Sequence, residues 1–355
     1  MSTRHRIDDL FAVLVAENGS DLHLSEGQPP KFRKHGEMTA LREEPLTSAE
    51  MEALLKEICR PKSWEKFNAT GDLDFAYEMD ADSRFRCNYH KHLHGIGAIF
   101  RLIPNRIKTI NELGVPKNME SFGDLRSGLV LVTGPTGSGK STTLAAIMDY
   151  INSTYARHVI TIEEPIEFVH NNKRSVITQR EVPTETPSFA SGLKSALRED
   201  SDVVLVGEMR DLETISLALT AAETGLLVFG TLHTNNAQKT IDRVIDAFPA
   251  DQQELIRTML STSLRGVVAQ LLLKRKDGKG RLAVNEILIS NPAVASIIRE
   301  GATHKLKDVI KSGRADGMQL MDDAIENFYK QGLITGQEAY MKSIDKLRFE
   351  DFRDK

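Results

Sequence analysis

The sequence predicts a protein of the α/β class, in which a mostly parallel sheet follows a smaller α+β domain. Two observations lead to this expectation. From Gly128 onward, short apolar segments alternate with helical ones, a rhythm that favours parallel strands joined by right-handed helical crossovers. Before residue 103, helical and period-two patterns are mixed, as in a small domain with helices packed on a sheet. The length of 355 residues suggests two domains, or three.

Helices and strands can be located along the first hundred residues. A helix is expected over residues 7–18, where apolar side chains recur at helical spacing, and it is expected to end at Asn18-Gly19. A second helix is expected from Ser48 to Cys59, with Thr47 or Ser48 as its N-cap. Strands, which show period-two alternation, are expected at residues 20–25, 73–77, 84–89 and 97–103.

The segment 104–117 follows neither pattern, and its prolines favour a linker. It separates an N-terminal domain at 1–103 from an α/β core expected at 118–290. A helical region at 291–355 completes the predicted organisation, because its apolar residues recur at helical spacing. Four apolar strands are expected in the core, at residues 128–133, 158–162, 202–206 and 226–232.

The most informative motif lies between the first of these strands and the helix that follows it. It fits G-x-x-x-x-G-K-[ST], a phosphate-binding pattern in which glycines let backbone N–H groups surround an anion. The helix N-terminus adds a positive partial charge, Lys140 is expected to reach the β- and γ-phosphates, and Ser141 to hold Mg²⁺. The alternative is a chance match, which the strand before and the helix after disfavour. The expected nucleotide-binding residues are Gly134, Pro135, Thr136, Gly137, Ser138, Gly139, Lys140, Ser141 and Thr142.

Carboxylates follow two more of the predicted strands, at the sheet edge where nucleotides bind in such folds. Glu163, Glu164 and Glu167 come directly after the second strand, and such groups can order Mg²⁺ or polarise the attacking water. Glu208 ends the third strand, the pattern of a Walker B acid, and is expected to contact Mg²⁺ through water. The alternative for the three acids after the second strand is a solvated turn, but beside a phosphate loop we favour function. Asp211, which follows Glu208, could simply be the N-cap of the next helix.

Histidines stand out at two places. His233 ends the fourth predicted strand, where a lone histidine is usually structural, but its place at the nucleotide edge favours sensing of the γ-phosphate. His90, His92 and His94 alternate and would share one face of a strand, which suits a metal. We favour ordinary surface side chains there, because Lys91 lies among them and no carboxylate is adjacent.

Arg84, Arg86 and Arg101 lie on predicted strands outside the α/β core. Surface charge is one interpretation of these arginines. The second is an arginine supplied to a bound nucleotide by a neighbouring domain or subunit.

Composition narrows the functional class. The formal net charge is −4 and the pI about 6.2, so no global basic field favours nucleic acid. No apolar run is long enough for a bilayer, and the first six residues are followed by Asp8-Asp9, which predicts a cytoplasmic protein. Cys59 and Cys87 fit a reducing compartment and offer no metal-site spacing.

Taken together, these motifs resemble the secretion-type ATPases, and within them the type IV pilus retraction ATPases. The resemblance extends over nearly the whole chain. Besides the phosphate loop, it includes an Asp-box-like segment and a His box. The matching segments are residues 19–24, 134–142, 161–167, 178–182, 196–200, 206–211 and 230–235.

The resemblance implies a PAS-like N-terminal domain, a RecA-like ATPase core and a homohexameric ring that uses ATP and Mg²⁺. It implies retraction of a type IV pilus, with an inner-membrane platform protein as partner and a location at the inner face of the cytoplasmic membrane. The implied site residues are Lys140 and Ser141 for phosphate and Mg²⁺, Glu163 and Glu167 as Asp-box acids, Glu208 as the Walker B acid, His233 of the His box, and Arg86 and Arg101 as N-domain arginines that approach the nucleotide.

Two departures from the family pattern affect these expectations. Glu164 stands where aspartate is usual, which moves the charge of a candidate metal ligand by one methylene. Residues 293–300 lack the first arginine and the asparagine of a segment found in retraction ATPases, so an accessory paralogue is an alternative. A pilus or secretion assembly ATPase, a RecA-like nucleic-acid motor and a regulator that binds ATP without turnover also stay open as functions. Two cysteines cannot build the four-cysteine zinc module that many assembly ATPases carry.

Overall fold

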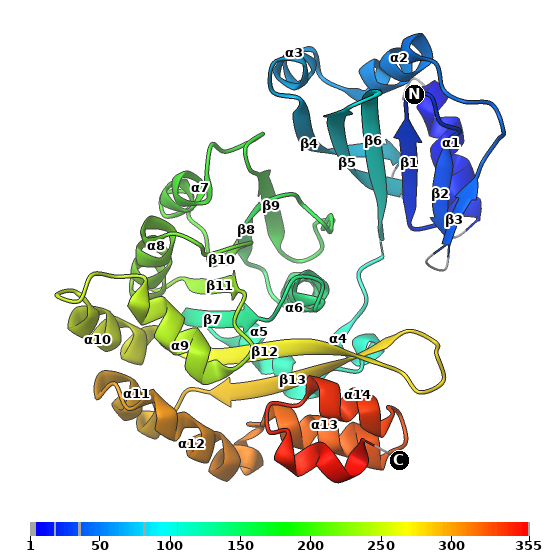
Figure 1. The fold of residues 1–355 in the computed structure, drawn as a ribbon. Coiled ribbons are helices and arrows are strands. Elements are labelled where there is room, and N and C mark those ends of the chain that lie inside the picture. The colour runs from blue at the N-terminus through cyan, green and yellow to red at the C-terminus, as the bar shows by residue number, and fades with distance from the viewer. Residues whose placement is uncertain (1–4, 18, 35–36, 81–82, 105, 354–355) are drawn as a thin grey trace. The chain divides into compact units, whose positions relative to one another are not determined.

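The structure is a computed structural model that describes residues 5–17, 19–34, 37–80, 83–104 and 106–353. The chain forms two compact units, Met1–Arg106 and Ile107–Lys355, each with its own sheet (Figure 1). The fold class expected from the sequence is confirmed, since the larger unit has a mostly parallel sheet and the smaller one is α+β. Among the described residues, no helix is both long enough and apolar enough to cross a membrane.

The first unit is a six-stranded antiparallel sheet in the order β3-β2-β1-β6-β5-β4. Helices α1 (Arg6–Ala16), α2 (Ser48–Ile58) and α3 (Pro61–Thr70) share a buried core with one face of this sheet. Thr47 caps α2, because its side chain accepts a hydrogen bond from the backbone of Glu50. Asn18, part of the expected end of α1, lies outside the described residues. The strands are β1 (Asp21–Ser25), β2 (Lys31–Lys34), β3 (Glu37–Ala40), β4 (Asp72–Asp80), β5 (Ser83–His92) and β6 (Gly95–Pro104).

The second unit has a seven-stranded sheet in the order β13-β12-β7-β11-β10-β8-β9. All neighbours are parallel except β12 and β13, which form an antiparallel pair. The sequence predicted four of these strands and missed β9, β12 and β13. The strands are β7 (Gly128–Thr133), β8 (His158–Glu163), β9 (Val176–Glu181), β10 (Val203–Val206), β11 (Leu227–Leu232), β12 (Leu264–Lys274) and β13 (Arg281–Ile289).

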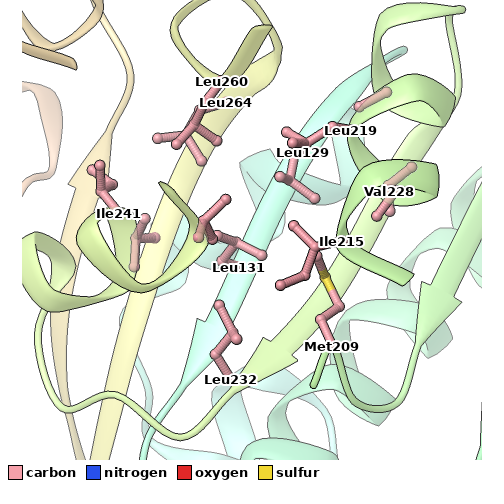
Figure 2. Packing of buried hydrophobic residues seen from close by; sticks show 14 of the residues in the cluster. Leu129, Leu131, Met209, Ile215, Leu219, Val228, Leu232, Ile241, Leu260 and Leu264 are labelled. Carbon is pink, nitrogen blue, oxygen red and sulfur yellow. The ribbon is translucent and has the colours of Figure 1, made fainter. Parts of the chain in front are cut away.

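Helices cover both faces of the second sheet. Figure 2 shows one face, where Leu129 of β7 and Val228 of β11 lie near Ile215 and Leu219 of α8, which are all buried. On the opposite face, α6 packs Ile147 and its neighbours against β7. The helices of this unit are α4 (Ile110–Leu113), α5 (Glu120–Asp124), α6 (Lys140–Thr154), α7 (Phe189–Ala196), α8 (Leu212–Glu223), α9 (Ala237–Asp246), α10 (Gln253–Ser263), α11 (Pro292–Arg299), α12 (Leu306–Ser312), α13 (Met321–Lys330) and α14 (Gly336–Lys342).

The segment expected as a linker is mostly part of the second unit. Residues from Ile107 onward belong to this unit. Ile110 and Val115 are 2% and 6% exposed and join the core around Val130 and Ile147. The prolines that suggested a linker therefore flank a short helix that is anchored by apolar side chains.

Candidate active site

The phosphate loop connects β7 to α6, and positive backbone φ angles at its glycines allow the turn. Gly134 has φ of 143° and Gly139 has φ of 86°, conformations that L side chains rarely adopt. Lys140 begins α6, and its Nζ donates hydrogen bonds to the carbonyl oxygens of Gly134 and Pro135, at 2.7 and 3.2 Å. The lysine amine is thus folded against the loop that precedes it.

The amine of Lys140 also lies within the field of two of the predicted acids. Burial lowers the pKa of Lys140, while the carboxylates of Glu208 and Glu167 act in the opposite direction. The carboxyl ends of β8 and β10 therefore bring negative charge to the phosphate loop, as the sequence predicted. Ser141 follows in the first turn of α6, on the wall of a cavity that also includes Glu163.

Arg210 and His233 both contact the carboxylate of Glu208. Its Oε1 lies 2.8 Å from Nε2 of His233 and accepts a hydrogen bond from Nε of Arg210. Burial by itself raises the pKa of this carboxyl group, but the hydrogen bonds from Arg210 and His233 outweigh it, so the pKa of Glu208 is lowered. The acid after β10 and the histidine after β11 therefore lie in one hydrogen-bonded cluster.

The three acids at and after the end of β8 have different surroundings. Glu163 is partly buried, and its Oε1 accepts hydrogen bonds from the Thr161 hydroxyl at 2.6 Å and from the Gln179 amide at 3.2 Å. Burial raises its pKa to about 7, despite the two hydrogen bonds. Glu164 and Glu167 are exposed. A carboxyl group that titrates near neutral pH is suited to proton transfer.

The predicted arginines lie together in the first unit. Arg86 of β5 is directly opposite Arg101 of β6 in the strand register, so the two side chains share one face of the sheet. Nε of Arg101 donates to Oδ1 of Asp21 at 2.8 Å, and Arg86 lies 3.6 Å from Asp74. Arg84 is on the same strand and face as Arg86. Their role toward a nucleotide stays a prediction.

The alternating histidines are divided between β5 and the turn that follows it. His90 and His92 are on β5, with ring centroids 5.9 Å apart, while His94 lies in the turn before β6. His92 contacts Ser25 at 3.2 Å. Within the described residues, no three His, Cys, Asp or Glu side chains are placed to hold a metal ion.

Comparison with known proteins agrees with this geometry. The model of the family described as type II/IV secretion system protein matches residues 4–346. The chain belongs to this family. The type IV pilus retraction ATPase PilT of Pseudomonas aeruginosa is 48% identical over 337 residues, which cover 95% of this chain and 98% of that protein. The type IV pilus ATPase PilU of the same organism is 37% identical over 343 residues, covering 96% and 90%. A crystal structure of the pilus retraction motor PilT with bound ADP matches with a TM-score of 0.91 and 42% identity, covering 97% and 98%.

The side-chain oxygens of Ser141 and Glu208 are ligands of the kind that Mg²⁺ takes. Ser141 supplies a hydroxyl group beside the phosphate loop, and Glu208 supplies an ionised carboxylate whose field reaches Lys140. Mg²⁺ commonly takes one or two protein oxygens and completes its shell with phosphate oxygens and water, so these two donors are sufficient. Glu164, the third expected metal residue, is exposed beside the cluster, where its charge acts on Arg210.

Three residues of the site were missed in the sequence. His170 is 9% exposed, lines the cavity of about 40 Å³ with Ser141 and Glu163, and burial lowers its pKa to about 4. Gln179 holds Glu163, and Gln270 contacts the phosphate loop from β12. The signal for Gln270 was present, since it is a lone amide in the apolar run 266–273. Gln179 lies in the matching segment 178–182, but without recognising β9 and β12 no strand order placed either glutamine near the phosphate loop.

Proposed function

We propose that this chain is an ATPase that drives retraction of a type IV pilus. The observation that carries the proposal is the meeting of the phosphate loop with the carboxylates that follow β8 and β10. Family membership and the 48% identity to a pilus retraction ATPase over 95% of the chain support the same function. ATP is then the substrate and ADP and phosphate are the products.

In this mechanism, the loop binds and the acids act on water. Backbone N–H groups of the loop and Lys140 hold the β- and γ-phosphates, and the N-terminus of α6 adds a favourable field. Ser141 and, through water, Glu208 would hold Mg²⁺, which would supply positive charge to the phosphate oxygens. His233 and Arg210 fix the Glu208 carboxylate. In this proposal, His233 senses the γ-phosphate, and its contact with Glu208 supports that role.

Glu163 and Glu167 are the two candidates for the general base. Glu163 has a pKa raised to about 7 and faces the cavity beside Ser141, so it can accept a proton from water near neutral pH. Glu167 is exposed, and its charge reaches Lys140. Replacing each in turn with glutamine and measuring single-turnover hydrolysis separates them, because loss of the base should slow the chemical step after ATP has bound more than loss of the other carboxylate does.

We infer a homo-oligomer, a hexamer by resemblance, in which Arg86 and Arg101 act on the nucleotide of a neighbouring subunit. An arginine supplied in trans stabilises the charge of the transferring phosphoryl group. Location at the inner face of the cytoplasmic membrane would follow from docking on a membrane-embedded pilus platform protein. A nucleic-acid partner is not proposed, given the net charge of −4.

The decisive experiment is a deletion strain in which twitching is measured and surface pili are counted. Cells that keep many pili but do not move support retraction. Bald cells support assembly and overturn the proposal. An accessory role, which the 37% identity to PilU and the altered 293–300 segment favour, predicts reduced movement with the main motor intact. Complementation by the wild-type chain, but not by its Lys140→Ala variant, ties either outcome to ATP use.

A further inference from the structure

Gln270 is a buried amide that joins three parts of the nucleotide site. It lies on β12 and is 1% exposed. Its Nε2 donates a hydrogen bond to the carbonyl oxygen of Ser138 at 2.8 Å. Its Oε1 accepts one from the Thr143 hydroxyl at 2.8 Å and one from the Asn285 amide at 2.9 Å. The phosphate loop, the first turn of α6 and β13 therefore meet at one side chain.

The backbone of β12 lies equally close to the loop. A Cβ atom at Gly134 would be 2.3 Å from the carbonyl oxygen of Gln270, and one at Gly139 would be 3.0 Å from its Nε2. Two glycines of the motif are thus needed for contact with Gln270, in addition to any need for space around phosphate. β12 is the surface on which the loop rests, and Gln270 is the polar contact between them.

The hydrogen bond to Ser138 has a directional consequence for the loop. In a planar trans peptide, the C=O of one residue and the N–H of the next point in opposite directions. Holding the Ser138 carbonyl toward β12 therefore turns the N–H of Gly139 away from β12. An anion cradle is built from such outward N–H groups. Thr143 ties the start of α6, whose N-terminus carries the favourable partial charge, to the same amide.

We propose that Gln270 is a positioning residue for the nucleotide phosphates, and that Asn285 orients its amide. The inference rests on the proposed nucleotide-binding function of this loop. Gln270 touches no part of the nucleotide in this proposal and acts through the Ser138–Gly139 peptide and through Thr143. The antiparallel pair β12–β13 is then part of the binding apparatus, as well as an extension of the sheet.

The test is Gln270→Met, which retains volume but leaves the Ser138 carbonyl, the Thr143 hydroxyl and the Asn285 amide without this partner. Contacts of loop N–H groups with phosphate exist in the ground and transition states alike, so their loss raises KM and leaves kcat nearly unchanged. We expect the KM for ATP and the Kd for Mg-ADP to rise together by at least about tenfold, with kcat within about threefold of the wild type.

Two further variants separate positioning from simple loss of structure. Asn285→Ala removes the amide that holds Gln270, and it should raise the same two constants by about threefold. Gln319→Ala is the matched control, because the Gln319 amide donates to the Asn285 backbone carbonyl at 2.8 Å and lies outside the loop. It should leave both constants unchanged. Thermal unfolding and the active fraction, titrated with a tight fluorescent ADP analogue, are recorded for each protein.

Unchanged ADP affinity in both Gln270→Met and Asn285→Ala overturns the inference, as does a fall in kcat with KM unchanged. If Gln270→Met does not fold, the Asn285→Ala result decides on its own. Lys140→Ala is measured in parallel. Were the wild type to show no Mg-ADP binding or turnover at all, the proposed function would fail, whereas binding that depends on Lys140 but not on Gln270 would contradict the positioning role alone.

Discussion

Lys140 and Glu163 in the second unit and Asp21 in the first have pKa values that their surroundings shift in opposite ways. In the second unit, burial lowers the pKa of Lys140 and raises that of Glu163 to about 7, so both groups are pushed toward their neutral forms. In the first unit, Asp21 is 8% exposed at its side chain and pairs with Arg101. Burial opposes ionisation there too, but hydrogen bonds from Ser20 and Arg101 prevail and lower the pKa of Asp21.

This difference supports the second unit as the one in which a ligand binds. Burial disfavours the charged forms of Lys140 and Glu163. A bound anion and metal ion would bring opposite charges that stabilise those forms. Asp21 and Arg101 of the first unit already neutralise each other, so a ligand would stabilise their charges less. Perturbed pKa values of this kind gather at functional sites. The second unit also carries the phosphate loop, and the first has arginines whose side chains are exposed, at 48% for Arg86 and 68% for Arg101.

The largest effect should come from removing the positive charge of Lys140 in the second unit. Lys140→Ala is expected to lower ATP turnover by at least ~100-fold, or about 2.7 kcal/mol, because the charge nearest the leaving phosphates is lost. Lys173→Ala is the control, since Lys173 forms an exposed ion pair with Asp149. Steady-state release of phosphate measures both. Turnover within about threefold of the wild type in Lys140→Ala would refute the assignment of the loop.

Removing acid charge from the same unit should have the next largest effect. Glu208→Gln and Glu167→Gln are each expected to lower kcat by about 10- to 100-fold while ADP affinity changes by less than about threefold. The charge matters most as the phosphoryl group transfers, and glutamine keeps the shape of the side chain. Exposed Glu213 provides the control Glu213→Gln. An equal loss of binding and turnover would instead indicate a structural or ground-state metal role.

The arginines of the first unit allow a test of whether one subunit completes the nucleotide site of its neighbour. Arg101→Ala is expected to reduce turnover by about tenfold, and mixing it with Lys140→Ala subunits should restore part of the activity. A ring can then pair an intact loop with an intact arginine from its neighbour. Specific activity of the wild type should also fall on dilution below the assembly constant. A fully active monomer by light scattering, or no restoration in rings shown to be mixed, contradicts action in trans.

The same comparison explains how much the sequence could predict. The phosphate loop, Glu208 and His233 were predictable because each directly follows an apolar strand, and parallel strands bring their carboxyl ends to one edge. Arg86 and Arg101 were located on strands, but their direct opposition depends on the register of β5 and β6, which no local pattern fixes.

Further parts of the site depend on contacts between residues distant in sequence. Gln270 is 132 residues from Ser138, and Gln179 is 16 from Glu163, so only the strand order reveals either contact. The strands β12 and β13 were missed although Leu264–Lys274 is long and apolar, because a run of this length also suits a buried helix. The short helix α4 was missed because prolines around a four-residue helix resemble a linker.

A smaller effect should appear in the pH dependence of the second unit's stability. Because the pKa of Glu163 is near 7 when folded and near 4.5 when unfolded, the folded state retains a proton that the unfolded state has lost between these values. Stability should therefore fall as pH rises from about 5 to 7, by up to about 1 kcal/mol per pH unit, and level off above. Glu163→Gln should remove this slope. Hydrogen exchange of the buried amides in β7 and β8 measures it, and an identical slope in the variant would show that another group titrates.

The first unit should respond to pH with the opposite sign and a smaller amplitude. The pKa of Asp21 is lowered in the folded state, so its ion pair with Arg101 stabilises the unit above about pH 4, and this contribution is lost as pH falls further. Solvent around Arg101 screens the pair, which limits the effect to less than about 1 kcal/mol. Trp64, the single tryptophan, lies in α3, so its fluorescence reports urea unfolding of this unit. Asp21→Asn should flatten the dependence between about pH 5 and 3. Glu163→Gln should leave the unfolding transition reported by Trp64 unchanged. A shift of that transition in Glu163→Gln would show that the charge of Glu163 affects the stability of the first unit.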